Sequence, residues 1–158
     1  REIIVSMEAE KCGLIPYLNM LANPLVKNEA DMIIPARESM LSYPKAQQLA
    51  EPLGNLVWRT LTGREFDMWF GPRIFQREMG RYFLNYDGEY GDKWDSIFIP
   101  VMDALYDGKN IVSMTINYLH PLEQTKIEDG NLELDLKRVE QLSELTGQLN
   151  KHWKKITR

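Results

Sequence analysis

Two hydrophobic patterns that follow one another in the chain constrain the fold more than any other feature. From Trp94 to Leu105 the apolar residues recur every three or four positions, which predicts an amphipathic helix over 93–106. After a turn at 107–110, apolar and polar residues alternate over 111–119, which predicts a strand with one buried face. Because helical and strand patterns occupy separate segments, we expect an α+β fold.

Most of the remaining chain has helical spacing. Pro16 should kink the first of these helices, and Pro52 with Gly54 should interrupt the third near residue 51. The stretch REFDMWF, which ends before Gly71, is typical of a short helical turn. The predicted helices cover residues 8–22, 28–42, 44–61, 72–84 and about 135–158.

Two further segments are candidates for strands. The β-branched run at 3–5 predicts a strand within 2–6, and the Asp129-Gly130 turn before alternating leucines predicts a hairpin strand within 124–136. The expected fold is therefore mainly helical α+β, with roughly five to seven helices and a small antiparallel sheet. An all-α bundle is the structural alternative. Because the chain shows no internal repeat or low-complexity linker, residues 1–158 are expected to form a single globular domain.

The composition is typical of a soluble, folded domain and narrows the range of partners. The formal net charge of −4 disfavours nucleic acid and anionic membranes as main partners, and no apolar run approaches the roughly 20 residues of a membrane span. The single cysteine, Cys12, excludes an internal disulfide and lies on an apolar helical face, where we expect a core residue. The compartment stays open: cytoplasm is the default, and a periplasmic or secreted mature form is compatible with a chain that starts at Arg1.

The acidic stretch NYDGEYGDKWDSIF, residues 85–98, raises the question of a metal site. Asp87, Glu89 and Asp92 are weak candidates for calcium or magnesium ligands, because the stretch lacks the alternating acids and distal glutamate of a calcium-binding loop. We interpret it as a helix connection in which Asp92 is the N-cap of the following helix. No cofactor is expected.

Three arginines recur every four residues in the predicted helix at 72–84. Arg73, Arg77 and Arg81 would line one face of that helix, where planar guanidinium groups suit phosphate, carboxylate or an acidic protein surface. The alternative is a solvated polar face with no ligand. Phosphate or nucleic acid binding through these arginines is thus a secondary hypothesis.

Three aromatic residues, Trp69, Tyr86 and Tyr90, are not explained by the periodicity of the helices around them. Aromatic side chains near arginine and acidic residues are typical of protein interfaces. The chain has no glycine-rich phosphate loop, dinucleotide fingerprint or nucleophile elbow, and one cysteine with two histidines excludes the common structural zinc sites. No catalytic residue is assigned.

The sequence therefore favours a non-enzymatic domain that binds another protein, of the adaptor, inhibitor or toxin-neutralising type. A phosphate or nucleic-acid binding module and a small metal-dependent hydrolase are the alternatives. The candidate binding residues are Trp69, Arg73, Arg77, Arg81, Tyr86 and Tyr90.

Overall fold

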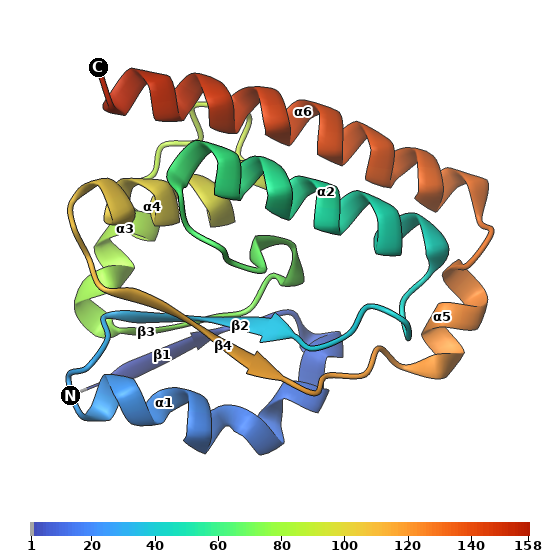
Figure 1. The fold of residues 1–158 in the computed structure, drawn as a ribbon, viewed down its shortest axis with the longest axis horizontal. Coiled ribbons are helices and arrows are strands. Elements are labelled where there is room, and N and C mark those ends of the chain that lie inside the picture. The colour runs from blue at the N-terminus through green and yellow to red at the C-terminus, as the bar shows by residue number, and fades with distance from the viewer. Residues whose placement is uncertain (1) are drawn as a thin grey trace.

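The computed structural model describes residues 2–158 and contains six α-helices, three 3₁₀ helices and four strands in that range (Figure 1). The expectation of a mainly helical α+β fold is confirmed, and the all-α alternative is wrong. The strands are β1 (Ile3–Ser6), β2 (Met32–Arg37), β3 (Arg73–Gln76) and β4 (Ile111–Ile116); the α-helices are α1 (Leu18–Val26), α2 (Lys45–Thr62), α3 (Gly80–Leu84), α4 (Asp95–Tyr106), α5 (Leu122–Glu128) and α6 (Leu132–Ile156); and the 3₁₀ helices are η1 (Ala9–Tyr17), η2 (Met68–Phe70) and η3 (Arg77–Met79).

The four strands form one mixed sheet in the order β1-β3-β2-β4. β3 runs antiparallel to both of its neighbours, whereas β2 and β4 run parallel, with Met32 opposite Ile111 and Arg37 opposite Ile116. The expected antiparallel sheet is therefore corrected to a mixed one. The parallel pair brings the carboxyl ends of β2 and β4 to the same edge of the sheet.

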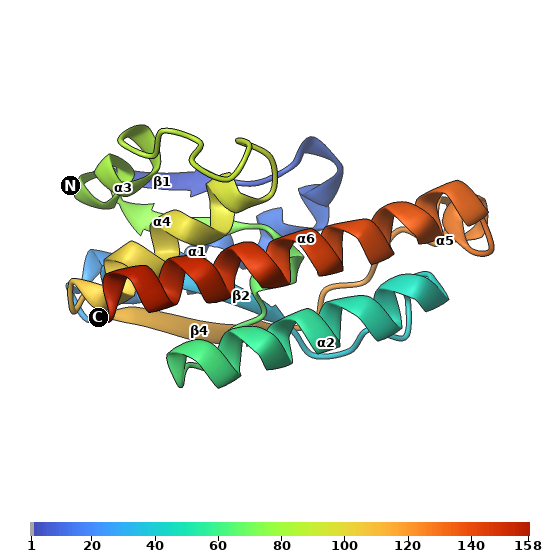
Figure 2. The same cartoon turned by 90° about the horizontal axis from the view of Figure 1, so that it is seen from above.

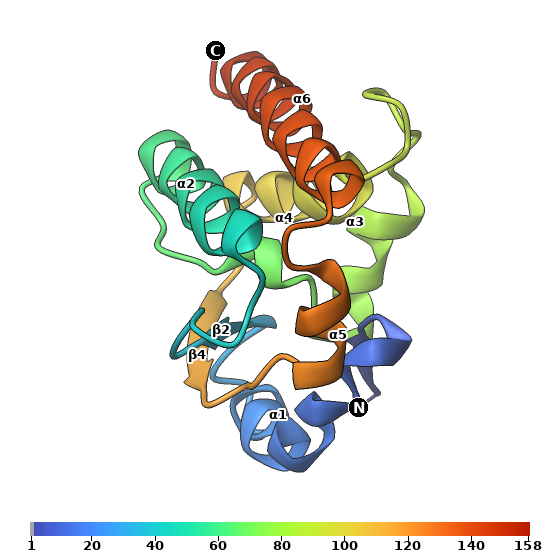
Figure 3. The same ribbon diagram turned by 90° about the vertical axis from the view of Figure 1, so that its right-hand side faces the viewer.

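Helices cover the two faces of the sheet unequally. α1 packs on one face, while α4 lies on the other with α2 and α6 above it (Figures 1 and 3). The side chains of β2 alternate between these layers: Met32 and Ile34 join the core under α2, α4 and α6, and Ile33 joins the core against α1. Both faces of β2 are thus buried.

Burial on both faces explains why the predicted helix at 28–42 is wrong. The segment contains β2, in which four consecutive residues, Met32–Pro35, are buried. A strand covered on both sides carries a continuous apolar run rather than an alternating one, and such a run also satisfies a helical spacing.

The predicted helix at 72–84 is also wrong in its first half. Residues 73–76 form β3, the strand that pairs with both β1 and β2, and only the end of the segment is helical, in η3 and α3. Arg73, Arg77 and Arg81 therefore do not share one helical face.

The hairpin expected within 124–136 is replaced by two helices. Asp129 and Gly130 connect α5 to α6, with Gly130 at a φ of 75°, a left-handed conformation that glycine adopts without strain. α6 then begins because the Asn131 side chain accepts hydrogen bonds from the backbone N–H groups of Glu133 and Leu134, at 3.1 and 3.3 Å. The alternating leucines belong to this helix.

The remaining expectations follow the structure more closely. The helices expected at 44–61 and 93–106 are confirmed as α2 and α4, and the strands at 2–6 and 111–119 as β1 and β4. α2 continues through the break expected near residue 51, and the first helix divides into η1 and α1. Within residues 2–158, no helix is both long and apolar enough to cross a membrane.

Candidate functional site

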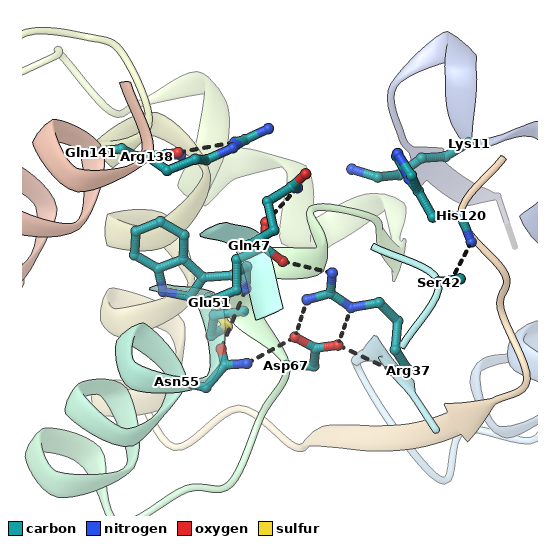
Figure 4. A network of polar contacts seen from close by, with 12 residues as sticks. Lys11, Arg37, Ser42, Gln47, Glu51, Asn55, Asp67, His120, Arg138 and Gln141 are labelled. Atoms are coloured by element: carbon teal, nitrogen blue, oxygen red, sulfur yellow. Dashed lines mark hydrogen bonds and ion pairs between the residues drawn. The ribbon is translucent and has the colours of Figure 1, made fainter. Parts of the chain in front are cut away.

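The candidate site lies at the carboxyl edge of the parallel strand pair. Arg37 is the last residue of β2, and Tyr118 and His120 follow β4. In open sheets, ligands bind preferentially in crevices outside the carboxyl ends of parallel strands. A cleft of about 350 Å³, here called the central cleft, opens at this edge; its walls include Lys11, Arg37, Tyr43, Glu51, Trp69, His120, Glu128, Arg138 and Gln141 (Figure 4).

A buried ion network forms one wall of the central cleft (Figure 4). Arg37 donates from Nε and Nη2 to the two carboxylate oxygens of Asp67, each at 2.8 Å, and from Nη1 to Glu51 at 2.6 Å. The side chain of Arg37 is only 1% exposed and that of Glu51 is 4% exposed. The fork of Arg37 is thus held in one orientation by two acids.

Helix α2 supplies three members of the network from one face. Gln47, Glu51 and Asn55 follow one another at intervals of four residues, so their side chains stack along the helix. Gln47 donates to Glu51 at 2.9 Å, and Asn55 donates to Asp67 at 2.8 Å. Gln47 gives the second carboxylate oxygen of Glu51 its partner, and Asn55 adds a second hydrogen bond to an Asp67 oxygen that Arg37 already contacts.

The network keeps its ion pair charged despite burial. Burial alone would raise the pKa of Asp67, but the hydrogen bonds and charge of Arg37 outweigh it and lower that pKa below its usual value. Burial likewise opposes the charge on Arg37, and the hydrogen bond and charge of Asp67, with the charge of Glu51, raise the pKa of Arg37 overall. Arg37 and Asp67 are therefore both ionised at neutral pH.

Three buried side-chain atoms of residues that line the central cleft have no hydrogen-bond partner in the described chain. They are Nε1 of Trp69, the hydroxyl oxygen of Tyr43 and Nε2 of His120; the rings of Tyr43 and His120 stack with their centroids 4.4 Å apart. Buried polar atoms in folded proteins are nearly always hydrogen bonded, so each exception requires an explanation.

His120 is held by a backbone hydrogen bond, and Nε2 of its ring is left without a hydrogen-bond partner. Its backbone N–H donates to Ser42 at 2.9 Å, and Nε2 lies 3.5 Å from a carboxylate oxygen of Glu128 without forming a hydrogen bond. Burial lowers the pKa of His120, and the nearby Glu128 carboxylate only partly offsets this effect. The imidazole is therefore neutral at pH 7 and can donate or accept a hydrogen bond.

The opposite walls carry mixed charge. Lys11 from η1 and Arg138 from α6 extend toward one another across the cleft (Figure 4). Arg138 donates to Gln141 at 3.1 Å, and Lys11 forms an ion pair with Glu8 at 3.0 Å. Four cationic and four acidic side chains line the central cleft; they are Lys11, Arg37, Lys137 and Arg138 with Glu8, Glu10, Glu51 and Glu128. The cleft is thus polar but close to neutral.

Two larger hollows lie elsewhere on the surface. One, of about 640 Å³, is on the other side of the Arg37–Asp67 pair and is lined by Ser113 and Thr115 of β4. The other, of about 590 Å³, lies between α6 and the loop that contains Tyr86 and is here called the loop hollow. Neither contains the unpartnered atoms of the central cleft.

Three of the predicted binding residues, Trp69, Arg73 and Arg77, lie in different environments in the structure. Trp69 is buried and lines the central cleft. Arg73 is fully buried and donates to the carbonyl oxygens of Pro72 and Met68, and burial lowers its pKa to about 10. Arg77 instead pairs with Glu2 on the surface at 2.8 Å, with both side chains mostly exposed.

Arg81 and Tyr86 line the loop hollow, and Tyr90 contacts His152, which also lines it. Arg81 donates to the hydroxyl of Tyr82 at 3.2 Å. Tyr86 donates to Asp95, and Tyr90 lies with its hydroxyl 3.3 Å from Nδ1 of His152. Both tyrosines are partly exposed. Their hydroxyl groups connect the loop between α3 and α4 to Asp95 of α4 and His152 of α6.

The weak metal candidates do not converge. Glu89 forms an ion pair with Lys155 at 2.8 Å, which lowers the pKa of Glu89, and Asp92 is not the N-cap expected for α4. The N-cap is Trp94, which makes no side-chain cap hydrogen bond, and Asp95 in the first turn accepts from the backbone N–H of Lys93 at 2.7 Å. Among residues 2–158, no three histidine, cysteine or acidic side chains, Asp87 included, form a cluster that could hold a metal ion.

The sequence offered only faint signals for the residues of the central cleft. Glu51 is the single acidic residue of α2, on the same face as buried Trp58, and that position was a sign of a buried charge. Arg37 lay in the segment 28–42, which was interpreted as helix, and Tyr43 lay in the break after it, so the edge that they share was not visible. Cys12, expected in the core, is exposed in η1.

The fold and the cleft define a class of structure: a mixed-sheet α+β domain with a ligand-sized cleft at the carboxyl edge of a parallel strand pair. Comparisons with protein-family models, with curated proteins and with solved structures gave no match.

Proposed function

We propose that the protein binds a small polar ligand in the central cleft. The observation that carries this proposal is the convergence of the unpartnered Tyr43 hydroxyl and His120 Nε2 on one cleft at the carboxyl edge of β2 and β4. A bound hydrogen-bonding ligand would satisfy both atoms. The cleft volume of about 350 Å³ lies within the range of small-molecule sites.

The buried ion network supports a functional role for this wall of the cleft. A buried ion pair often contributes no more stability than packed apolar residues would, because desolvation offsets the Coulomb attraction. Arg37 also lies over the ring of Tyr43, 4.7 Å from its centroid. The network therefore positions the tyrosine that borders the ligand.

The balance of charge in the central cleft indicates the chemistry of the ligand. Acids and cations are equal in number, and donors and acceptors occur on facing walls. Such a lining suits a molecule with several hydrogen-bonding groups and little net charge. A highly charged polyphosphate would place anionic groups beside Glu8, Glu10 and Glu51 and is disfavoured.

His120 and Glu128 add the capacity for proton transfer. A neutral imidazole can accept a proton from a ligand group bound at Nε2, and the Glu128 carboxylate 3.5 Å away would stabilise the resulting cation. Acid–base chemistry on the bound ligand is therefore compatible with the site, in contrast to the non-enzymatic function favoured by the sequence.

The test is a ligand screen by thermal unfolding with a matched variant. Neutral polyols and saccharides, amino acids, dicarboxylates and nucleotides would each be added at millimolar concentration; a neutral, hydroxyl-bearing or zwitterionic compound should raise the Tm by preferential binding to the folded state. Tyr43→Phe should fold with unchanged or slightly higher stability, because it removes an unsatisfied buried hydroxyl, yet lose the Tm shift.

Tyr106→Phe is the control, since Tyr106 is exposed and lies outside the cleft. A ligand-induced shift that survives in Tyr43→Phe and in His120→Gln would place the ligand elsewhere. Failure of every compound class to raise the Tm would contradict the proposal.

Protein binding at the loop hollow is the second candidate function. It is favoured by Arg81 and Tyr86 in the lining of a hollow of about 590 Å³, with Tyr90 in contact with His152 of the same lining. An affinity pull-down would compare the wild-type chain with Arg81→Ala, because exposed arginines are frequent anchors of interfaces. A partner that is retained equally by both proteins would exclude this surface.

A further inference from the structure

Opposite charges line the central cleft without pairing with one another. Glu128 of α5 and Arg138 of α6 both lie in its wall, where α5 leads into the start of α6 at one end of the molecule (Figure 2). Arg138 is half-buried, yet no carboxylate of residues 2–158 lies within ion-pair distance of its guanidinium group. Buried charges are normally paired, so this guanidinium is open to an anionic group from a ligand.

Lys11 adds donors on the wall that faces Arg138. The two side chains extend toward one another across the cleft (Figure 4). An ammonium group has three N–H donors, and the pair of Lys11 with Glu8 at 3.0 Å leaves others for a ligand. Arg138 has five N–H groups, of which Nη1 donates to Gln141 at 3.1 Å. A carboxylate in the cleft would therefore meet donors on two sides.

His120 and Glu128 form a pair of acceptors in the same cleft. Oε1 of Glu128 accepts from Gln124 at 2.8 Å, whereas Oε2 lies 3.5 Å from Nε2 of His120 with no hydrogen bond between them. In the tautomer that carries its proton on Nδ1, the neutral imidazole presents Nε2 as an acceptor. The two facing acceptors then lack a proton between them, and an ammonium group could donate one N–H to each.

Apolar side chains complete the lining of the central cleft. Trp94 and Ile97, at the start of α4, are half-buried and border the cleft. The buried Trp69 and Phe98 also line it. Small-molecule sites are lined mainly by such side chains, with a few polar groups that fix the orientation of the ligand. A ligand that fills this cleft should therefore carry an apolar group in addition to its charges.

We infer that the ligand of the central cleft is an amino-acid-like zwitterion with an apolar side chain. This inference rests on the proposed function, the binding of a small polar ligand in that cleft. The ligand carboxylate accepts from Arg138 and Lys11. Its ammonium group donates to His120 and Glu128, and its side chain packs against the apolar part of the lining. A polyol would instead leave the charge of Arg138 without a partner.

The first test compares free leucine with analogues that each lack one of its groups. Leucinamide lacks the carboxylate, isocaproate lacks the amine, and glycine lacks the apolar side chain. Leucine should bind at millimolar concentration, and leucinamide and isocaproate should each bind about tenfold more weakly or worse, because each loses charge-assisted hydrogen bonds. Glycine should also bind more weakly, because it buries less apolar surface. Isothermal titration calorimetry measures the four affinities.

Two variants assign the charges of the ligand to residues of the cleft. Arg138→Gln should weaken the binding of leucine about tenfold and reduce its preference over leucinamide, because the partner of the carboxylate is absent. Glu128→Gln should reduce the preference for leucine over isocaproate in the same way. Lys154→Gln and Glu123→Gln are the matched controls, since these residues are exposed on α6 and α5 and lie outside the cleft lining. Circular dichroism melts would establish that each variant is folded.

The outcomes separate this inference from ligand binding as such. Polyols or saccharides that bind in the cleft while no amino acid does would overturn the zwitterion and leave the proposed function standing. Leucine binding that is lost in Tyr43→Phe but unchanged in Arg138→Gln would overturn the place assigned to the carboxylate. Equal affinities for leucine, leucinamide and isocaproate would show that the charges are not recognised and would also overturn the inference. If no compound of any class binds, the proposed function fails as well.

Discussion

Arg37 and Asp67 form a buried bidentate ion pair, with two hydrogen bonds of 2.8 Å between the guanidinium fork and the carboxylate. The backbone N–H of Arg37 donates to the same carboxylate at 3.0 Å. The pair ties the end of β2 to the residue that precedes η2. It therefore fixes the wall of the central cleft relative to the sheet.

Removal of one member of this pair should be strongly destabilising. Asp67→Ala leaves Arg37 with Glu51 as its only acidic partner in the interior, and we expect the free energy of unfolding to fall by about 3–5 kcal/mol. Urea unfolding would measure the difference. Glu65→Ala is the control, because Glu65 is exposed and forms only a 3.7 Å pair with Arg59. Equal stability losses in the two variants would contradict a structural role for the buried pair.

The same pair should govern part of the acid unfolding. The pKa of Asp67 is lower in the folded chain than its ordinary value of 3.8, so the unfolded state binds more protons. This stabilisation is complete above the unfolded pKa and is lost as the pH falls below about 4, through the folded pKa. Unfolding in urea at a series of pH values should show that the stability of Asp67→Asn falls less steeply over this window. A parallel decline in both proteins would assign the acid sensitivity to other carboxyl groups.

A second pH dependence should appear at higher pH. Burial depresses the pKa of His120 below its ordinary value of 6.5, so the unfolded state binds the proton more readily. The contribution of neutral His120 to the free energy of unfolding is complete above the pKa of the unfolded state, and it is lost progressively as the pH falls from about 7 towards the pKa of the folded state. His120→Gln should remove this part of the profile. NMR titration of the histidine ring would check the direction of the shift, and a pKa above that of the unfolded chain would contradict it.

Two glycines in helices should respond in opposite ways to alanine. A Cβ at Gly54 would lie 2.1 Å from Nε1 of Trp69, so Gly54→Ala should destabilise the fold by about 1–3 kcal/mol despite the higher helix propensity of alanine. At Gly147 a Cβ would meet nothing within 4 Å, and Gly147→Ala should stabilise the chain by about 0.5–1 kcal/mol. Thermal unfolding of the two variants gives the comparison. Stabilisation by both would show that Trp69 moves readily.

Gly54 also explains why α2 does not break where the sequence suggested. Pro52 and Gly54 both lower helix propensity, yet the helix runs from Lys45 to Thr62 without interruption. The absence of a side chain at Gly54 lets Trp69 pack against the helix, and the Arg37 network holds Glu51 on the same face. Tertiary contacts thus override a local preference.

The sequence by itself determined the elements whose apolar residues recur at the period of the element. α4 and β4 are of this kind, and the mainly helical α+β class follows from them. α2 was found from the helical spacing of its leucines, although Leu49, Leu53 and Leu56 are exposed and its buried face carries Glu51 and Trp58. β1 was found from its short β-branched run, although most of its residues are exposed.

Only the tertiary structure decided the sheet and the candidate site. β2 and β3 are covered on both faces, which removes the alternation that identifies a strand. The central cleft joins Arg37, Glu51 and His120, with Asp67 bonded to Arg37 behind the wall; these residues lie far apart in the sequence and meet because β2 and β4 pair in parallel while α2 packs over them. Local patterns carry no information about such pairing, because it depends on contacts between segments rather than on the order of residues within one.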